Sequence, residues 1–328
     1  KKAKRKVLRK ALEIIPTSEN LWKEAIALED EEDAKVMLNR AVEVLPQQVD
    51  LWLALARLET YQNAKVILNR AVKNLPNEPQ VWLAAAFLEE ENGNKNIEVI
   101  IKKAISLMQQ NKIVIKREEW LTVHAYKSED SDHLETCRAI VRCTIGVGIE
   151  ESNRKHTWLK DARQAAEIDA ETKTRHLETA RAIFAHALSV FPTKKSVWRR
   201  AAQLEKQHGT SASLLELLKR AVNNCPHAED LWLMAAKEKW VSGDIDGARQ
   251  LLADAFTTNK DNEDVWLAAM KIEYEANEIS RARDLLVEAR KHANTARVWM
   301  KSALLERNVN NIDAAKQLLV KGLQQFPQ

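Results

Sequence analysis

Nine of the ten tryptophans recur at nearly regular intervals, and this rhythm limits the fold more than any other feature of the chain. The intervals are 30, 30, 38, 38, 40, 34, 34 and 33 residues, between Trp22, Trp52, Trp82, Trp120, Trp158, Trp198, Trp232, Trp266 and Trp299. Repeats of this length are typical of arrays that stack one small unit many times, because one unit alone cannot bury its apolar face.

Each repeat shows the pattern of two helices. Trp52 is followed by Leu55, Ala56 and Glu59, and these offsets of three, four and seven lie on one face of a first helix, helix A. A second helix, helix B, shows strings such as "AKVILNRA" and "ARDLLVEA", with outer alanines seven residues apart. Proline cannot continue a helix, and it marks the turn into the next helix A six residues before five of the tryptophans. These prolines are Pro16, Pro46, Pro76, Pro192 and Pro226.

We therefore predict an all-α fold, a solenoid of helix-turn-helix repeats that forms one array over residues 1–328. About nine Trp-marked repeats follow an N-terminal B helix. Extra residues near 109–119, 146–157 and 168–177 predict loops or helix extensions at the edge of the stack. Gly322 and Pro327 keep the spacing of a B helix, so we expect another tryptophan beyond Gln328 and a chain that is a fragment of a longer array.

Composition excludes several classes of protein. The net charge is only +4 and the sequence pI is about 8.8, well short of the dense basic footprint of a dedicated nucleic-acid-binding domain. No apolar run approaches the roughly 18 residues that suggest a membrane helix. The three cysteines, Cys137, Cys143 and Cys225, form no C-x-x-C pair, which indicates reduced thiols in an intracellular protein.

A search for chemistry finds no catalytic, cofactor-binding or metal-ligating set. The histidines show no H-x-x-x-H spacing, and Cys137 and Cys143 lie in an apolar B helix, where core packing is favoured over a ligand pair. The "GVG" string at 146–148 is interpreted as a helix end, since it lacks the third glycine of a dinucleotide loop. The basic "KKAKRKVLRK" string is interpreted as the solvated face of a helix, with an RNA or nuclear-import patch as the alternative. We predict that the chain is not an enzyme and holds no cofactor.

The candidate partner-binding residues lie on the A helices, away from the Trp–Glu stripe. The position five after the tryptophan holds Arg57, Phe87, Arg163, Lys237 and Lys271, and the position eight after it holds Trp240 and Tyr274. Aromatic and basic residues such as these are enriched at binding surfaces. Packing against adjacent helices is an equal alternative.

The glutamate seven residues after the tryptophan occurs in six repeats, and we expect it to pair with a cation of a B helix; the alternative is an exposed glutamate without a structural contact. The candidate cations are Lys35, Lys65, Arg249 and Arg283. The fourth, fifth and seventh repeats hold Lys127, Ala165 and Lys239 at this position, so another contact must replace the glutamate there.

These patterns resemble the HAT (half-a-TPR) family more than ordinary tetratricopeptide repeats, because no glycine follows the tryptophan and the downstream glutamate is frequent. The resemblance implies a right-handed α-α superhelix and a role in RNA processing. Three strings, "LWLALARLETY", "IGVGIEESNRKHTW" and "FPTKKSVWRRAAQLEKQHGT", resemble the repeat region of the pre-mRNA-processing factor six family of the spliceosomal tri-snRNP.

That resemblance implies a non-catalytic protein–protein interaction scaffold in the nucleus, bridging snRNP subcomplexes in tri-snRNP assembly. Its partners would be other spliceosomal snRNP proteins, with RNA contacted indirectly and no membrane. The alternative is a HAT-repeat factor of another RNA-processing complex that binds RNA directly through basic faces. Self-association into a homo-oligomer through end repeats or flank surfaces is a third interpretation.

Overall fold

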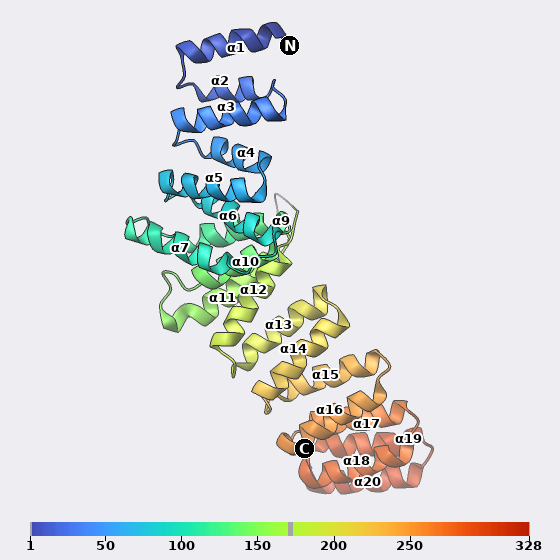
Figure 1. The fold of residues 1–328 in the computed structure, drawn as a ribbon. Helices are drawn as coiled ribbons and strands as arrows, with labels where there is room; N and C mark the ends of the chain where they lie inside the picture. Colours follow the sequence, from blue (N-terminus) through green and yellow to red (C-terminus); the bar gives the residue numbers. More distant parts are fainter. Residues whose placement is uncertain (1, 170–172, 328) are drawn as a thin grey trace. The chain divides into compact units, whose positions relative to one another are not determined.

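The computed structural model describes residues 2–169 and 173–327, and every regular element in these residues is helical. Contacts divide the chain into two compact units, residues 1–186 and 187–328, and each is described by itself. Within each unit, helices A and B alternate along the chain and pack side by side with their sequence neighbours (Figure 1). The predicted all-α solenoid of repeats is confirmed, whereas the continuity of one array over residues 1–328 stays a prediction.

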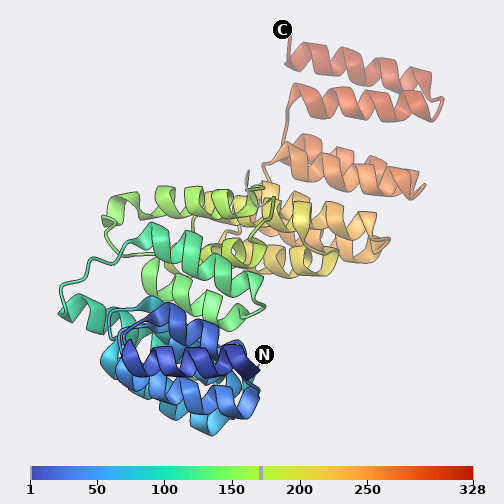
Figure 2. The ribbon, with the colours of Figure 1, turned by 90° about the horizontal axis from the view of Figure 1, so that it is seen from above.

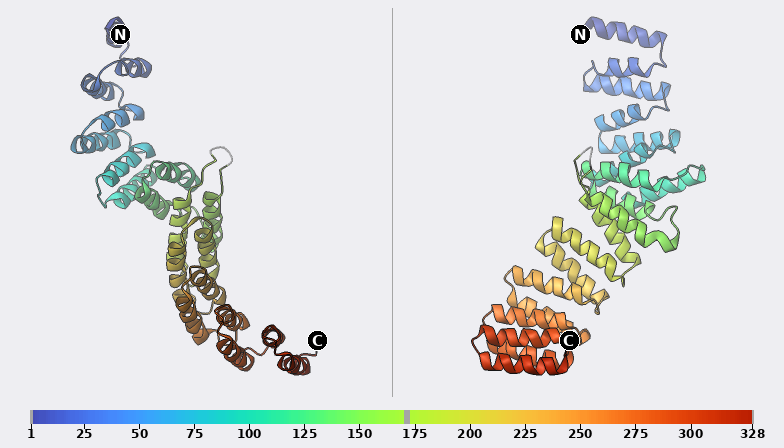
Figure 3. Two further views of the ribbon diagram at one scale, coloured as in Figure 1. Left: turned by 90° about the vertical axis from the view of Figure 1, so that its right-hand side faces the viewer. Right: turned by 180° about the vertical axis from the view of Figure 1, so that it is seen from behind.

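The first unit begins with a B helix and continues through the repeats of the first five tryptophans. Figure 3 shows its first helices, α1 to α5, following one another in turn. The helices are α1 (Lys2–Ile14), α2 (Glu19–Ile26), α3 (Glu31–Val44), α4 (Val49–Leu58), α5 (Tyr61–Asn74), α6 (Pro79–Glu91), α7 (Ile97–Gln110), α8 (Arg117–Glu119), the π-helical turn η1 (Trp120–Ala125), α9 (Tyr126–Asp130), α10 (Leu134–Thr144), α11 (Glu151–Ala166) and α12 (Leu177–Val190).

The second unit contains the repeats of the last four tryptophans. Each is a hairpin of two helices of nearly equal length, as α19 and α20 show (Figure 2). The helices are α13 (Lys195–His208), α14 (Ser211–Asn224), α15 (Glu229–Val241), α16 (Ile245–Thr258), α17 (Glu263–Glu275), α18 (Ile279–His292), α19 (Ala296–Asn308) and α20 (Ile312–Gln325). The A helices α2 and α4 have 8 and 10 residues against 13 in α6, so the shorter spacing of the early repeats is matched by shorter A helices.

The tryptophans lie in the core between helices. Trp52 and Trp198 are each 1% exposed, and the other repeating tryptophans are at most 8% exposed except Trp299, which is partly exposed. The outer alanines of the B helices are buried as well, for example Ala64 and Ala71 on α5. Small residues on helix B therefore let helix A approach closely enough for the indole to fill the space between them.

The indole N–H explains why a proline stands six residues before the tryptophan. Trp198 Nε1 donates to the carbonyl oxygen of Pro192 at 2.7 Å, and Trp22, Trp52, Trp82 and Trp232 make the same bond to their prolines at 2.8–3.0 Å. Trp266 has no such proline and donates to the carbonyl of Lys260, also six residues earlier. The proline thus ends helix B, and its carbonyl satisfies a buried donor of the next helix A.

In five repeats, the turn from helix A to helix B contains a residue with a positive φ close to the end of helix A. In four repeats this residue lies eleven positions after the tryptophan: Gly93 (71°), Gly243 (85°), Asn277 (62°) and Asn310 (60°). In the Trp120 repeat it lies twelve positions after, at Asp132 (60°). Left-handed conformations at this point close the end of a helix, and glycine and asparagine adopt them at the lowest cost.

The extra residue of the Trp120 repeat is absorbed by the π-helical turn Trp120–Ala125. The backbone N–H of His133 bonds to the carbonyl of Ser128, just as Asn94 N–H bonds to the carbonyl of Glu89. Ser128, eight residues after Trp120, therefore takes the place that Glu89 holds seven residues after Trp82. The prediction that Lys127 occupies this place is wrong, because a π turn holds one residue more than an α turn does.

The predicted pairs between the glutamate of helix A and a cation of helix B form across repeats. Lys65 Nζ lies 2.9 Å from Glu89 Oε1, and the corresponding distances from Arg249 Nε to Glu273 and from Arg283 Nε to Glu306 are both 2.7 Å. In each case the cation is 23 or 24 residues before the glutamate, so it joins helix B to the next helix A.

Lys35 is the exception among the four predicted cations. It pairs with Glu31 and Glu32 of its own helix, at 3.4 and 3.3 Å. Its counterpart Glu59 lies beyond the end of the short helix α4, on extended backbone. The prediction fails there because the helix that would carry the carboxylate has already ended.

The three predicted insertions differ in structure. Residues 111–116 connect α7 to α8 without a regular helix, whereas the second insertion places residues 151–157 in an N-terminal extension of α11. Gly146 and Gly148 follow the end of α10, and Gly148 has a φ of 70°, so "GVG" is a helix end as predicted. Within the third insertion, 168–177, residues 170–172 lie outside the described part of the chain.

Candidate functional site

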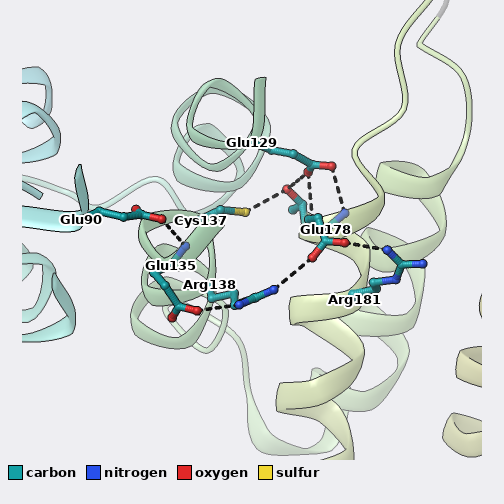
Figure 4. A network of polar contacts seen from close by, with 8 residues as sticks. Glu90, Glu129, Glu135, Cys137, Arg138, Glu178 and Arg181 are labelled. Carbon is teal, nitrogen blue, oxygen red and sulfur yellow. Dashed lines mark hydrogen bonds and ion pairs between the residues drawn. The ribbon is translucent and has the colours of Figure 1, made fainter. Parts of the chain in front are cut away.

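Two places gather polar side chains, and the first is a network in the first unit that joins three repeats (Figure 4). Glu129, in the last turn of α9, accepts hydrogen bonds from the backbone N–H groups of Glu178 and Thr179, both at 2.9 Å, and from Thr179 Oγ1 at 2.7 Å. Glu90 on α6 does the same for Glu135 and Thr136 at the start of α10. A carboxylate of one repeat therefore caps the B helix of the next, where backbone N–H groups and the helix dipole favour negative charge.

The strings that receive these caps are nearly identical. They are "HLETCRAI" at 133–140 and "HLETARAI" at 176–183, 43 residues apart. Each histidine stacks on an aromatic ring from helix A of the preceding repeat. His133 lies on Phe87, with ring centroids 4.0 Å apart, and His176 lies on Tyr126, at 3.7 Å. A carboxylate oxygen lies near each histidine Nε2, from Glu91 at 3.2 Å and Asp130 at 3.3 Å.

This network holds helices together rather than reacting. Burial raises the pKa of the Cys137 thiol to about 12, so the thiol is protonated at neutral pH and is a poor nucleophile. Its sulfur lies 3.3 Å from Thr179 Oγ1, which already donates to Glu129. Both oxygens of Glu129 and of Glu90 accept hydrogen bonds from the protein itself. Neither carboxylate is therefore poised to accept a proton from a substrate.

The second place is a groove in the second unit that the A helices α15, α17 and α19 line. Its cavity volume is about 860 Å³. Four of the predicted partner-binding residues lie in its wall: Lys237, Trp240, Lys271 and Tyr274. These four residues come from two repeats whose A helices are separated in the sequence by a full B helix. A groove of this volume falls within the range of about 300–1,000 Å³ that ligand sites occupy.

The floor of the groove is apolar. Leu233 on α15, Leu267 on α17 and Leu304 on α19 all line it, with Ala236, Ala268 and Met270 between them. Small residues at the contact between α15 and α17 let these A helices lie against each other, as do α17 and α19. Apolar side chains surrounded by a few polar groups are the usual composition of a binding site.

Aromatic rings and charges surround this floor. Trp240 is partly buried, and the ammonium of Lys271 lies 6.0 Å from its ring centroid, at the outer limit for a cation–π contact. Lys271 also lies 3.7 Å from Glu275, and Arg297 pairs with Asp264 at 2.5 Å. Trp240 is the one tryptophan outside the repeating rhythm, and its place in the groove shows that it does not fill the core between two helices.

The other three predicted partner residues lie outside this groove, in the first unit. Arg57 on α4 is exposed. Arg163 on α11 is exposed and pairs with Glu167 at 2.8 Å. Phe87 is partly buried against His133, so one face of its ring is already covered. The role of all seven residues in partner binding stays a prediction.

Several residues of the groove were missed from the sequence, and α19, on which no partner-binding residue was predicted, contributes six of them. Arg307 lies eight residues after Trp299, so the same offset that selected Trp240 and Tyr274 could have found it. Lys301 lies at a different offset, and only the packing of α19 beside α17 brings it to the groove. The duplicated "HLET" strings were a readable signal for the network, although the caps themselves join residues about 45–50 positions apart.

In residues 2–169 and 173–327, no three side chains of His, Cys, Asp or Glu come close enough together to hold a metal ion. None of the described helices has both the length and the apolar character needed to cross a bilayer.

The known proteins that are similar to this chain in sequence include two pre-mRNA processing and splicing factors. The human pre-mRNA-processing factor 6 is 52% identical over 114 residues, which is 34% of this chain and 11% of that protein. The Schizosaccharomyces pombe pre-mRNA-splicing factor prp1 is 44% identical over 137 residues, 42% of this chain and 14% of that protein. The matched segments thus span only about a tenth of the length of these relatives.

A solved structure of a thermophilic TPR protein from Thermus thermophilus is 19% identical, with a TM-score of 0.35, and covers 53% of this chain and 92% of that one. The family model described as PRP6, TPR-like domain, matches residues 54–328, which include both capped B helices and the whole groove. The chain therefore belongs to the PRP6 family and comprises HAT-type repeats of its TPR-like domain.

Proposed function

We propose that this chain is a non-catalytic scaffold of the pre-mRNA splicing machinery, which acts in the nucleus and bridges snRNP subcomplexes during tri-snRNP assembly. The human and fission-yeast relatives are named as pre-mRNA processing and splicing factors, which supports the process. The observation that carries the scaffold role is the groove of α15, α17 and α19, where a solenoid offers an apolar floor with aromatic and basic walls.

A scaffold rather than an enzyme is also supported by the polar network of the first unit. The carboxylates of Glu90 and Glu129 cap helices, and the buried thiol of Cys137 stays protonated at neutral pH. The interactions that dominate are the burial of indoles and alanines between helices. Stacked repeats generally create extended binding surfaces, which is the property a bridging protein needs.

The proposal is tested by affinity purification of the tagged chain from nuclear extract, with cross-linking and quantitative mass spectrometry. We expect snRNP proteins to be enriched and some of their cross-links to fall on α15, α17 and α19. The variant that carries Lys237→Glu and Lys271→Glu should remain folded and recover at least one of these proteins less well. Absence of any enrichment of snRNP proteins by the wild-type chain would contradict the proposal.

The alternative, direct RNA binding through basic faces, has its strongest support in the basic helix α1. Two of its cations are already paired, however, since Lys4 lies 2.9 Å from Glu24 and Arg9 lies 2.9 Å from Glu29. Binding to phosphates would show as a steep fall in affinity with salt. An electrophoretic mobility assay with structured RNA at increasing salt therefore separates the two functions.

A further inference from the structure

The groove of α15, α17 and α19 carries positive charge that the protein itself does not neutralise. Lys237, Lys301 and Arg307 line the groove, and none of them forms an ion pair with another described residue. The two carboxylates of the wall are already occupied, because Asp264 pairs with Arg297 and Glu275 lies beside Lys271. The free charge of the groove is therefore positive.

The free cations lie on the two outer helices, and the apolar and aromatic side chains are most continuous on the central one. Lys237 is on α15, whereas Lys301 and Arg307 are on α19. Between them α17 presents Leu267, Ala268, Met270 and Tyr274. A ligand that lies across the three helices thus meets positive charge, then an apolar floor, then positive charge again.

From this arrangement we propose that the groove binds an extended acidic segment of a protein partner, in which one apolar side chain is flanked by carboxylates on both sides. The proposal rests on the scaffold function proposed above and names the chemistry of one partner. The apolar side chain would lie over Leu267 and Ala268 of α17. The flanking carboxylates would pair with Lys237 on one side and with Lys301 and Arg307 on the other, because partly desolvated ion pairs fix the register of a bound peptide.

The width of the groove sets the length of this segment. Packed helices lie about 8–10 Å apart, so the axes of α15 and α19 are separated by roughly 16–20 Å. An extended chain rises about 3.3 Å per residue, so about five or six residues cross the groove. An acidic residue near each end of such a segment and an apolar one at its centre therefore match the positions of the cations and the floor.

A protein segment fits this groove better than RNA does. The ammonium of Lys271 lies over the ring of Trp240, on a face that a stacked base would need. The apolar floor offers no hydrogen-bond donor to phosphate oxygens, whereas it accommodates an aliphatic side chain.

The test measures binding of a synthetic peptide to the whole 328-residue chain by fluorescence anisotropy. The probe is a fluorescein-labelled peptide of seven residues, with a central leucine, a glycine on each side of it and two glutamates at each end. We expect saturable binding, and about tenfold or greater weakening when the leucine becomes glycine or the glutamates become glutamines. Hydrogen exchange of the unmodified chain should slow in α15, α17 and α19 when the peptide is bound.

Variants of the chain distinguish the groove from general charge. The double variant Lys237→Glu and Arg307→Glu should weaken binding of the peptide by about tenfold or more. The matched control, Lys219→Glu with Lys316→Glu, removes two exposed cations from the B helices α14 and α20 and should stay within about twofold. Circular dichroism checks that each variant is folded, and the exchange experiment needs no variant.

Three results would overturn the proposal. They are no binding up to about 1 mM peptide, equal losses in the groove and control variants, or tighter binding of a ten-nucleotide oligouridine that the groove variant abolishes. The scaffold function has a separate readout. If the wild-type chain enriches snRNP proteins from nuclear extract and the groove variant enriches them equally, only the acidic-segment proposal fails.

Discussion

Replacing Glu129 by alanine tests whether the carboxylate caps hold neighbouring repeats together. The change removes three hydrogen bonds at the start of α12, to the N–H groups of Glu178 and Thr179 and to Thr179 Oγ1. Thr179 is fully buried, so water cannot take the place of the carboxylate without a structural change. The variant therefore leaves at least one buried donor without a partner.

The expected magnitude follows from two contributions. Loss of an N-terminal cap costs about 0.5–2 kcal/mol. A buried donor left without a partner costs about 1–3 kcal/mol more. Because the two contributions share the same carboxylate, we expect the free energy of unfolding to fall by about 2–4 kcal/mol rather than by the sum of three separate bonds. Glu129→Gln keeps one acceptor oxygen and should lose less.

The assay combines urea denaturation, followed by circular dichroism, with hydrogen exchange of individual amides. We expect the amides of Glu178 and Thr179 to exchange about tenfold faster or more in Glu129→Ala. The matched control is Glu150→Ala, since Glu150 is exposed beside the start of α11 and its side chain forms no capping bond. That control should change stability by no more than about 0.5 kcal/mol. If Glu129→Ala behaved like the control and both amides kept their exchange rates, the carboxylate would not be a cap.

Three further predictions address the indoles, the ion pairs and the turns. Trp198→Ala should lower the free energy of unfolding by about 3–5 kcal/mol, because a large buried side chain is lost. Trp198→Phe should lower it by about 1–3 kcal/mol, because the carbonyl of Pro192 loses its hydrogen-bond donor. Equal losses of the two variants in urea titrations would contradict the role of the indole N–H. The hydrogen bond from Arg283 lowers the pKa of Glu306, so the ionised form stabilises the fold above the ordinary pKa of about 4.3 and this contribution disappears as the pH falls through the lowered value. As the pH falls below about 4.3, thermal melts should therefore lose stability more steeply in the wild type than in Glu306→Gln, and parallel curves would disprove the linkage. Gly243→Ala should lower the free energy of unfolding by about 1–2 kcal/mol, because φ is 85° at this residue. Gly146→Ala, at a position without a positive φ, should change it little. If Gly243→Ala left stability unchanged, the backbone of the turn would not require glycine.

Much of the fold could be predicted because it depends on short sequence offsets. The tryptophan, the alanines seven apart and the proline six residues before the next tryptophan all lie within one repeat, and the structure buries or bonds them as a set. The cation of helix B was also found, since Arg249 and Arg283 stand at a fixed place in their helices. What the offsets did not reveal is that the partner carboxylate belongs to the next repeat, because helix contacts across repeats depend on packing rather than on distance along the chain.

The groove was predicted only in part for a similar reason. A fixed offset from the tryptophan selects equivalent positions along successive A helices. It therefore found Lys237 with Lys271 and Trp240 with Tyr274. Lys301 lines the groove from a position only two residues after Trp299, and no sequence pattern indicates that this face of α19 lies toward α17. Single residues on a helix can be placed from periodicity, whereas the line along which two helices meet is set by all the side chains between them.

The π-helical turn shows that contacts between repeats constrain the structure more than the number of residues within one repeat does. One residue added to an α-helix rotates everything after it by about 100°, which would turn Glu129 away from α12. The turn at Trp120–Ala125 absorbs the extra residue, so Tyr126, Glu129 and Asp130 meet His176 and α12 as Phe87, Glu90 and Glu91 meet His133 and α10. The backbone of this helix is less regular than an α-helix, but the carboxylate cap and the ring stack between repeats are retained. Contacts between repeats, rather than the count of residues within one, therefore determine where each side chain of this family member lies.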